Sequence, residues 1–307
     1  MTHTSLPIIR VDVQKAVDEN GQTYSIFTGF CRYELGDVEV FALIDGYTDL
    51  GLDTFVGDDP VALQYFLGAA FVADDHIQFG VIAHAIRTPE ATILIDAGSG
   101  TTFGPAAGHL FKSMALAGLE PNAFDLVLLS HLHTDHTGGL LVDERAAFPN
   151  AELVMNRIEY EFFTDAAAAA QSSARIKPAF TLAQRLGDFY PRIRLIEGEV
   201  WITSAVQALP AYGHTPGHTV FMVHSPKERL LVLGDTVFSS DFSFQYLDYT
   251  LAFDNDVTHA RKTRRRLLTY AMQERLLIAG THLPFTSLGH VRSYGPAFEF
   301  VPLRLVP

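Results

Sequence analysis

A short histidine-rich run is the most informative feature of the chain. Four side chains that can bind metal fall within six residues, namely His131, His133, Asp135 and His136. Imidazole nitrogens suit zinc and similar ions, and a neighbouring carboxylate adds a harder oxygen ligand. A lone histidine is usually structural, but three histidines and an aspartate at this spacing indicate a metal site.

Three later segments add residues of the same chemical type. They contribute His214, Asp235 and His282, each next to an apolar run of the kind that forms a strand. One zinc ion ordinarily takes four ligands, or three and a water when it is catalytic. Together with the first motif these residues make seven, which is too many for one ion. The set suits two ions that share a bridging carboxylate and hydroxide.

Buried strands must deliver these side chains to one place. Apolar runs at 91–95, 125–130, 229–233 and 276–279 predict strands that end just before chemically interesting residues. Helices are predicted over 60–68, 105–119, 156–170, 175–186 and 257–275. Strands followed by helices occur in both halves, which predicts an α/β fold with two facing sheets and outer helices. We expect a single domain over 1–307, with residues 1–30 as an irregular N-terminal arm.

Charge limits the classes of partner. The chain carries 22 basic and 35 acidic side chains, so its net charge is −13. Such a chain repels polyanions on average, and we therefore expect no nucleic acid partner. One basic cluster stands out, at 261–266, and a solvated helix face explains it better than a nucleic acid site.

The remaining composition points to a protein in the cytoplasm. Cys31 is the single cysteine, so no intramolecular disulfide forms and we expect it to be a small core residue. Residues 1–10 do not resemble a signal peptide, and the apolar runs are too short to span a bilayer. We therefore expect a cytoplasmic protein with no membrane partner.

The order of the motifs resembles the metallo-β-lactamase superfamily of hydrolases. The resemblance rests on HxHxDH at 131–136, GHTPGH at 213–218, Gly234-Asp235 and the final His282. Within the superfamily the chain is most similar to the methyl parathion hydrolase-like and lactonase-like members. That similarity rests on DAGSGTTFGP, SHLHTDHTGGL, AFPNAEL, GDTVF and THLPFTSLGHVR. It implies an αββα sandwich with the site between the two sheets.

The resemblance also implies a role for each residue. His131, His133 and His214 would hold one metal, and Asp135, His136 and His282 the other. Asp235 would bridge the two ions. Asp96 and His218 would support the ligands from behind, although each could equally be a satisfied turn residue. We expect two divalent ions, zinc before iron, manganese or cobalt.

The expected chemistry is hydrolysis by a metal-held hydroxide. Two ions about 3.5–4 Å apart lower the pKa of a shared water, so hydroxide forms near neutral pH. Asp135 and Asp235 are the expected catalytic carboxylates, and no serine or cysteine nucleophile is required. The chain has no G-x-S-x-G motif.

Aromatic residues near the motifs suggest a neutral, partly apolar small-molecule substrate. By resemblance, Phe103, Phe163 and Phe238 would line its pocket. Acyl-homoserine lactonases carry a tyrosine where this chain has Phe238, which weakens that assignment. A carboxylic ester or lactone is therefore our first expectation, with promiscuous cleavage of organophosphate triesters.

Other functions stay open at this point. An acyl-homoserine lactonase is the alternative within the same chemistry. A nuclease, a mononuclear iron oxygenase and a degenerate binding protein are the alternatives from other classes, although no ligand of the motif is missing. Relatives are often dimers, so a homodimer is also open.

Overall fold

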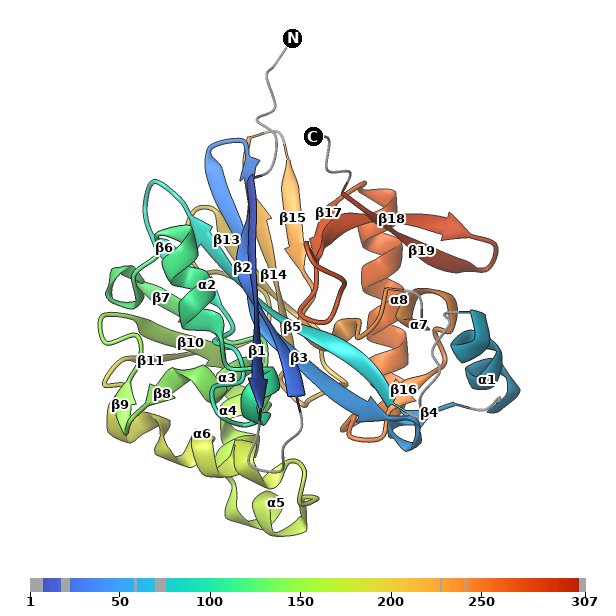
Figure 1. Cartoon of the computed structure of the whole chain (residues 1–307), viewed down its shortest axis with the longest axis horizontal. Helices are drawn as coiled ribbons and strands as arrows, with labels where there is room; N and C mark the ends of the chain where they lie inside the picture. The colour runs from blue at the N-terminus through green and yellow to red at the C-terminus, as the bar shows by residue number, and fades with distance from the viewer. Residues whose placement is uncertain are drawn as a thin grey trace.

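Two mixed β-sheets pack face to face, and helices cover the outer face of each (Figure 1). This computed structural model describes residues 8–17, 23–57, 60–69, 76–226, 228–240 and 242–303. The first sheet contains eight strands and the second seven. The predicted αββα arrangement is confirmed.

The first sheet holds the N-terminal half of the chain. Its strands, in spatial order, are β1 (Ile8–Val17), β2 (Thr23–Leu35), β3 (Val38–Gly51), β5 (His76–Arg87), β6 (Thr92–Ile95), β7 (Leu126–Leu128), β10 (Glu152–Asn156) and β11 (Ile193–Ile196). The strands from β6 to β11 run parallel to one another, whereas those from β1 to β6 are antiparallel.

The second sheet holds the C-terminal half. Its strands, in order, are β12 (Val200–Trp201), β13 (Val206–Pro210), β14 (Thr219–His224), β15 (Arg229–Val232), β17 (Leu277–Ala279), β18 (Leu288–Tyr294) and β19 (Ala297–Pro302). Only β15 and β17 pair in parallel among these described strands. Two short pairs lie outside both sheets, β4 (Phe55–Val56) with β16 (Thr250–Leu251) and β8 (Leu141–Val142) with β9 (Arg145–Ala146).

Eight α-helices of the described residues connect the strands. They are α1 (Pro60–Ala69), α2 (Leu110–Ala117), α3 (Thr134–Thr137), α4 (Arg157–Thr164), α5 (Ala166–Gln171), α6 (Lys177–Phe189), α7 (Phe242–Gln245) and α8 (Val257–Gln273). No helix in these described ranges is both long and apolar enough to cross a bilayer.

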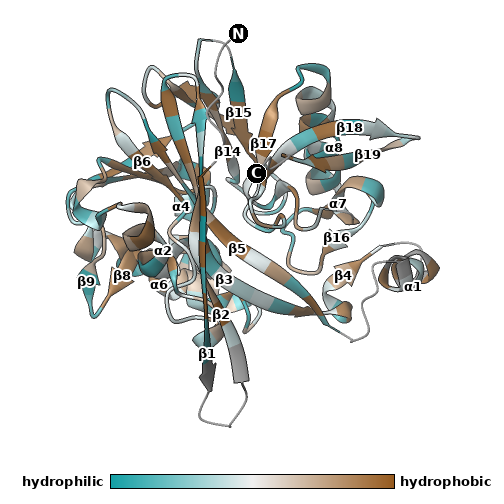
Figure 2. Cartoon of the chain, turned by 45° about the horizontal axis from the view of Figure 1, so that its top comes forward, coloured by the Kyte–Doolittle hydropathy of each residue, from teal (hydrophilic) through white to brown (hydrophobic). Residues whose placement is uncertain are grey.

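The central core lies between the two sheets. Ile82 and Leu128 from the first sheet share one buried cluster with Phe221 and Val232 from the second. Strands such as β5 and β6 carry the hydrophobic stretches that build this core (Figure 2). Each such side chain contributes about 1.5–3 kcal/mol when it leaves water. The sandwich is thus a rigid frame for the loops at its edge.

Separate cores attach the outer helices. Met114 of α2 and Phe180 of α6 pack on the first sheet, and Leu267 and Leu268 of α8 pack on the second. Cys31 is fully buried in the central core, so the prediction that it is a core residue is confirmed.

The predicted irregular arm at 1–30 is wrong wherever the structure describes it. Residues 8–17 and 23–30 form β1 and part of β2, an antiparallel pair at the edge of the first sheet. Apolar and polar residues alternate along 9–13, which is the period of a strand. Residues 1–7 and 18–22 lie outside the described part of the chain.

Two predicted helices differ in their limits. The helix expected over 156–170 is divided at Asp165, whose carboxylate caps α5 by accepting hydrogen bonds from the amides of Ala167 and Ala168. The helix expected over 105–119 is shorter, because Gly104–Ala106 form a separate 3₁₀ turn and α2 begins at Leu110. The remaining long helices and central strands lie within a few residues of their predicted limits.

Candidate dinuclear metal site

All four ligand-type motifs meet at one edge of the sandwich. The loop after β7 carries the 131–136 run, and the turn between β13 and β14 carries His214. Asp235 follows β15, and His282 follows β17. Carboxyl ends of parallel strands open onto a common crevice, which is where open sheets place their functional loops. The seven side chains singled out in the sequence therefore converge in space.

The first group of ligand residues consists of His131, His133, His214 and Asp235, which contributes its Oδ2 atom. His131 Nε2 and His214 Nε2 each lie 3.0 Å from His133 Nδ1. Asp235 Oδ2 is 3.8 Å from His131 Nε2 and 3.4 Å from His214 Nε2. All four residues are buried, and their ligand atoms lie within 4.8 Å of one another.

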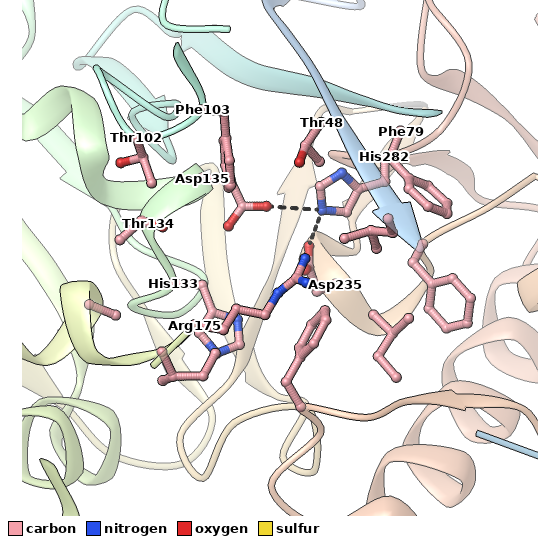
Figure 3. Close-up of a pocket in the computed structure, with 16 residues that line it drawn as sticks. Thr48, Phe79, Thr102, Phe103, His133, Thr134, Asp135, Arg175, Asp235 and His282 are labelled. Carbon is pink, nitrogen blue, oxygen red and sulfur yellow. Dashed lines mark ion pairs between the residues drawn. The ribbon is translucent and has the colours of Figure 1, made fainter. Parts of the chain in front are cut away.

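The second group consists of Asp135, His136, His282 and again Asp235, which contributes its Oδ1 atom. Asp235 Oδ1 lies 3.1 Å from His136 Nε2 and 3.3 Å from His282 Nε2. Asp135 Oδ2 lies 3.7 Å and 3.4 Å from the same two nitrogens. Asp235 thus offers one oxygen to each group, and the two groups share this single residue. Figure 3 shows His282 between its two carboxylate partners, Asp135 and Asp235.

These spacings fit two tetrahedral metal ions. Ligands about 2.1 Å from a zinc ion at tetrahedral angles lie about 3.4 Å apart. The separations within both groups bracket that value. The buried atoms His136 Nε2 and Asp235 Oδ1 have no hydrogen-bond partner, which is the state expected of atoms that face a cation. The residues present therefore fit a divalent metal pair.

The opposite ring nitrogens of the histidines are held in place. His136 Nδ1 lies 2.8 Å from Asp96, and His214 Nδ1 lies 2.6 Å from Asp254. His282 Nδ1 lies 2.7 Å from the carbonyl of Gly80. Such contacts fix the tautomer and the ring orientation of a metal-binding histidine and raise its basicity.

Asp96 connects the first ligand loop to the sheet. Its Oδ1 accepts a hydrogen bond from the amide of Ser130, and its Oδ2 accepts one from the hydroxyl of that residue. The same Oδ2 faces His136, so Asp96 supports the loop and one ring together. Its backbone takes the left-handed conformation, with φ at 61°.

His218 lies behind the bridging residue. Its Nε2 accepts a hydrogen bond from the amide of Asp235, and its Nδ1 donates one to the carbonyl of Ala211. Burial lowers its pKa to about 3, so the ring is neutral and this donor–acceptor pattern is fixed. The contact holds the backbone of Asp235 rather than its carboxylate.

Two supporting acids had no signal in the sequence. Asp254 holds His214, as described above. Glu159 in α4 is buried and accepts hydrogen bonds from the amides of Leu132 and Gly217, so it ties the loop after β7 to the turn between β13 and β14. Burial raises its pKa to about 7. A lone acidic residue in a helix pattern, such as Glu159, or in a turn, such as Asp254, is typical of a solvent-facing position, so neither could be identified.

Glycines beneath the first ligand loop permit a close approach of backbones. A Cβ atom at Gly138 would lie 2.0 Å from the carbonyl oxygen of Ser99, and one at Gly139 would lie 2.1 Å from that of Ala97. Gly138 has ordinary helical angles, so tight packing rather than an unusual turn requires the missing side chain.

The ligand groups lie at the floor of one cavity. His133, Asp135, Asp235 and His282 contribute to its lining, and the other walls are mostly apolar. Phe103 and Phe238 line it, as expected, together with Phe79 and Phe253. Sequence reasoning missed Phe79 and Phe253, since each lies outside the recognisable motifs.

Phe163 lies elsewhere. It is fully buried in the helix core, where its ring packs on Phe162 and Phe180. It meets the site only through an edge contact with His133, at 5.9 Å between ring centroids. It borders a neighbouring cavity rather than the one above the ligands. The expectation that it lines the same pocket is therefore corrected.

Comparisons with known proteins agree with this geometry. The family model of the Metallo-beta-lactamase superfamily matches residues 79–282. An N-acyl homoserine lactonase of a Bacillus species is 28% identical over 167 residues, which cover 54% of this chain and 58% of that protein. The lactonase AttM of Azorhizobium caulinodans is 33% identical over 123 residues, covering 38% of this chain and 42% of its own. The chain thus spans only about half the length of these curated relatives, 58% of the first and 42% of the second.

Solved structures extend the similarity to nearly the whole chain. The dizinc quorum-quenching lactonase AidC, crystallised with a product, superposes with a TM-score of 0.84 at 28% identity, over 91% of this chain and 99% of that one. The hydrolase AbOPH of the β-lactamase superfamily gives 0.81 at 24% identity, over 91% and 98%, and supports the fold alone. Fold, ligand geometry and family match agree, and the chain belongs to the metallo-β-lactamase superfamily.

Proposed function

We propose that this protein is a dinuclear metal-dependent hydrolase that opens a lactone, or cleaves a related carboxylic ester, of a small and partly apolar molecule. One observation carries the proposal. Two four-membered ligand groups share Asp235 at the floor of an apolar pocket. Such an arrangement is built for two-metal hydrolysis rather than for structural support, because a structural zinc site is closed to substrate.

In this proposal His131, His133 and His214 hold one ion, and Asp135, His136 and His282 hold the other, with Asp235 between them. Two divalent cations, zinc first, would supply a hydroxide nucleophile near neutral pH and polarise the carbonyl of the substrate. Asp235 sets the separation of the two groups through its two oxygens. Asp96, His218, Asp254 and Glu159 keep the ligands oriented.

Asp135 is the acid that can act on the substrate side. Its side chain is 15% exposed, whereas that of Asp235 is 4% exposed. Although burial opposes ionisation, His136 and His282 lower the pKa of Asp135 to about 2. It therefore stays ionised and serves as a ligand. The proton that the leaving alkoxide needs would come from the attacking hydroxide and would pass through this carboxylate.

The pocket supports a lactone or ester with an apolar part. Phe79, Phe103, Phe238 and Phe253 form most of its aromatic wall. Relatives named as N-acyl homoserine lactonases favour lactone opening, and acyl-homoserine lactones are the alternative substrates. Phe238 is buried and has no hydroxyl to bond such a substrate, so we place other lactones and aryl esters first. Organophosphate triesters would be promiscuous substrates.

Several earlier expectations continue as proposals. A small molecule is the partner, while a homodimer, the absence of nucleic acid binding and a cytoplasmic location are further predictions. A nuclease or a mononuclear iron oxygenase would be the alternative reading. An oxygenase should contain about one iron per chain, whereas the proposed hydrolase should contain two metal ions, so metal analysis separates them.

The test is a hydrolysis screen over lactones, aryl esters, phosphotriesters and β-lactams. It uses the native protein, His133→Ala and the control His259→Ala, which removes an exposed histidine outside the site. We expect lactones or aryl esters to be cleaved, with a loss of at least about a hundredfold in His133→Ala because one ligand is gone. Full activity of His133→Ala would contradict the proposal.

A further inference from the structure

One positively charged side chain in the pocket wall, that of Arg175, has no role in the proposed hydrolysis. Arg175 comes just before α6 and lines the cavity with Asp135, Asp235 and the aromatic residues. In the view of Figure 3 its side chain extends over the pocket rather than away from it. Among the described lining residues it is the one arginine or lysine.

A ring stack holds this arginine in place. The Arg175 guanidinium carbon lies 4.9 Å from the centroid of the Phe253 ring. Phe253 in turn makes edge contacts with His133 and His214, each at 5.9 Å between ring centroids. A cation over an aromatic face gains about 0.5–1 kcal/mol at an exposed position. Phe253 thus contacts both the cation and two of the candidate metal ligands.

The hydrogen-bond donors of this guanidinium have no partner among the residues that the structure describes, and it forms no ion pair with any of them. Stacking leaves the planar edge of an arginine free, and that edge matches both oxygens of a carboxylate. Two other exposed arginines, Arg157 and Arg292, face glutamates, which occupy their donors.

The charge of the pocket favours an anion. Asp135 and Asp235 are the acidic residues in the described lining, and two divalent cations would more than balance them. Arg175 adds one further positive charge at the mouth. The local field is then positive although the whole chain has a net charge of −13, because a bound ion overrides the global charge near it.

We propose that Arg175 is a specificity-determining residue that binds a carboxylate carried by the substrate away from the scissile bond. The natural substrate would then be an anionic lactone or ester with an apolar body, not a neutral one. This inference rests on the proposed hydrolase function and names its substrate class.

Matched substrates test the inference. Dihydrocoumarin-6-carboxylate and 6-acetyldihydrocoumarin have the same lactone and nearly the same shape, but only the first is charged. Turnover of both is compared in the native protein, Arg175→Gln and Arg175→Lys. The control is Arg185→Gln in α6, which also removes an arginine over a phenylalanine ring but lies outside the pocket lining.

We expect Arg175→Gln to lower kcat/KM for the carboxylate about tenfold and for the acetyl compound less than about twofold, since one charge-assisted pair is lost. Arg175→Lys should retain part of the preference, because it keeps the charge without the fork. Raising the salt concentration from about 0.05 to 0.5 M should reduce the preference of the native protein. Equal effects on both substrates, or none, would overturn the inference.

Binding separates this inference from the hydrolase proposal. The two corresponding lactams, 2-oxo-tetrahydroquinoline with a 6-carboxylate or a 6-acetyl group, resist hydrolysis, and calorimetry measures their affinity. A preference for the carboxylate that disappears in Arg175→Gln supports the role of Arg175 even if neither lactone is cleaved. In that case only the proposed function fails. No preference for the carboxylate would refute the assignment of Arg175.

Discussion

Replacing Asp254 by alanine removes the carboxylate that orients His214. The two side chains are 2.6 Å apart, and that of Asp254 is 2% exposed. Loss of such a supporting contact typically weakens metal binding by 10–100-fold, or about 1.4–2.7 kcal/mol. We expect a loss in this range for the ion held by His131, His133 and His214, and a smaller one for the other.

The Asp254 side chain also shapes its own turn, and this second effect must be separated. Its other oxygen lies 3.3 Å from the amide of Leu251. Asp254→Asn keeps the shape and one acceptor oxygen but replaces the other oxygen by an amide nitrogen and removes the charge, so its effect should fall between those of Asp254→Ala and the native protein. Asp188→Ala, at an exposed position of α6, is the control for a lost carboxylate.

A chelator competition measures the affinity of both ions in each variant, and urea unfolding of the metal-free proteins measures stability. We expect Asp254→Ala to bind metal more weakly than the native protein, by more than its loss of stability in the metal-free form can account for. If Asp254→Ala binds both ions as tightly as the native protein and is only less stable, the contact with His214 has no role in metal binding.

Three further predictions concern stability and the metals. Burial lowers the pKa of His84 from 6.5 to about 4. The unfolded chain therefore binds a proton at His84 more tightly than the folded protein does. The contribution of neutral His84 to the unfolding free energy is complete above pH 6.5 and is lost as the pH falls toward 4. Between pH 7.5 and 5, the unfolding free energy measured in urea should fall by about 2 kcal/mol less in His84→Gln than in the native protein. An equal fall in the two proteins would refute this role of His84. Arg264→Met should lower the unfolding free energy by about 3 kcal/mol in the same assay, because the buried carbonyls of Thr236, Leu247 and Tyr249 lose their donor. The control Arg265→Met, on the exposed face of α8, should lower it by less than about 0.5 kcal/mol. Equal losses in the two variants would refute the role of Arg264 as a buried donor. Removing metal with a chelator should lower the melting temperature and abolish hydrolysis, and adding zinc should restore both; an unchanged melting temperature would argue against bound metal.

Much of the fold could be predicted because its strands and helices carry strong local patterns. Continuous apolar runs identified the central strands, and the 3.6-residue period identified helices such as α8. The edge pair β1–β2 was not predicted because both of its strands are partly exposed, and such strands carry no long continuous apolar run. The basic cluster of α8 was read as solvated, yet Arg264 is 2% exposed and lies over the Phe238 ring.

The ligands of the site could be found from sequence because four chemically unusual residues stand together at 131–136. Asp96 and His218 were predicted by resemblance as supporting residues, but Glu159, Asp254 and Arg175 could not be found, because they look like ordinary surface charges in the linear chain. Their roles depend on contacts between segments that are far apart, such as Glu159 with Gly217. Phe163 shows the opposite error, since a position inferred by resemblance belongs here to the helix core.

The central claim is that two cations lie on either side of Asp235, each within one of the two ligand groups. Anomalous diffraction from crystals of the protein purified with zinc tests it most directly. We predict two peaks per chain, one among His131, His133 and His214 and the other among Asp135, His136 and His282. A single peak, or peaks away from the Asp235 carboxylate, would contradict the claim.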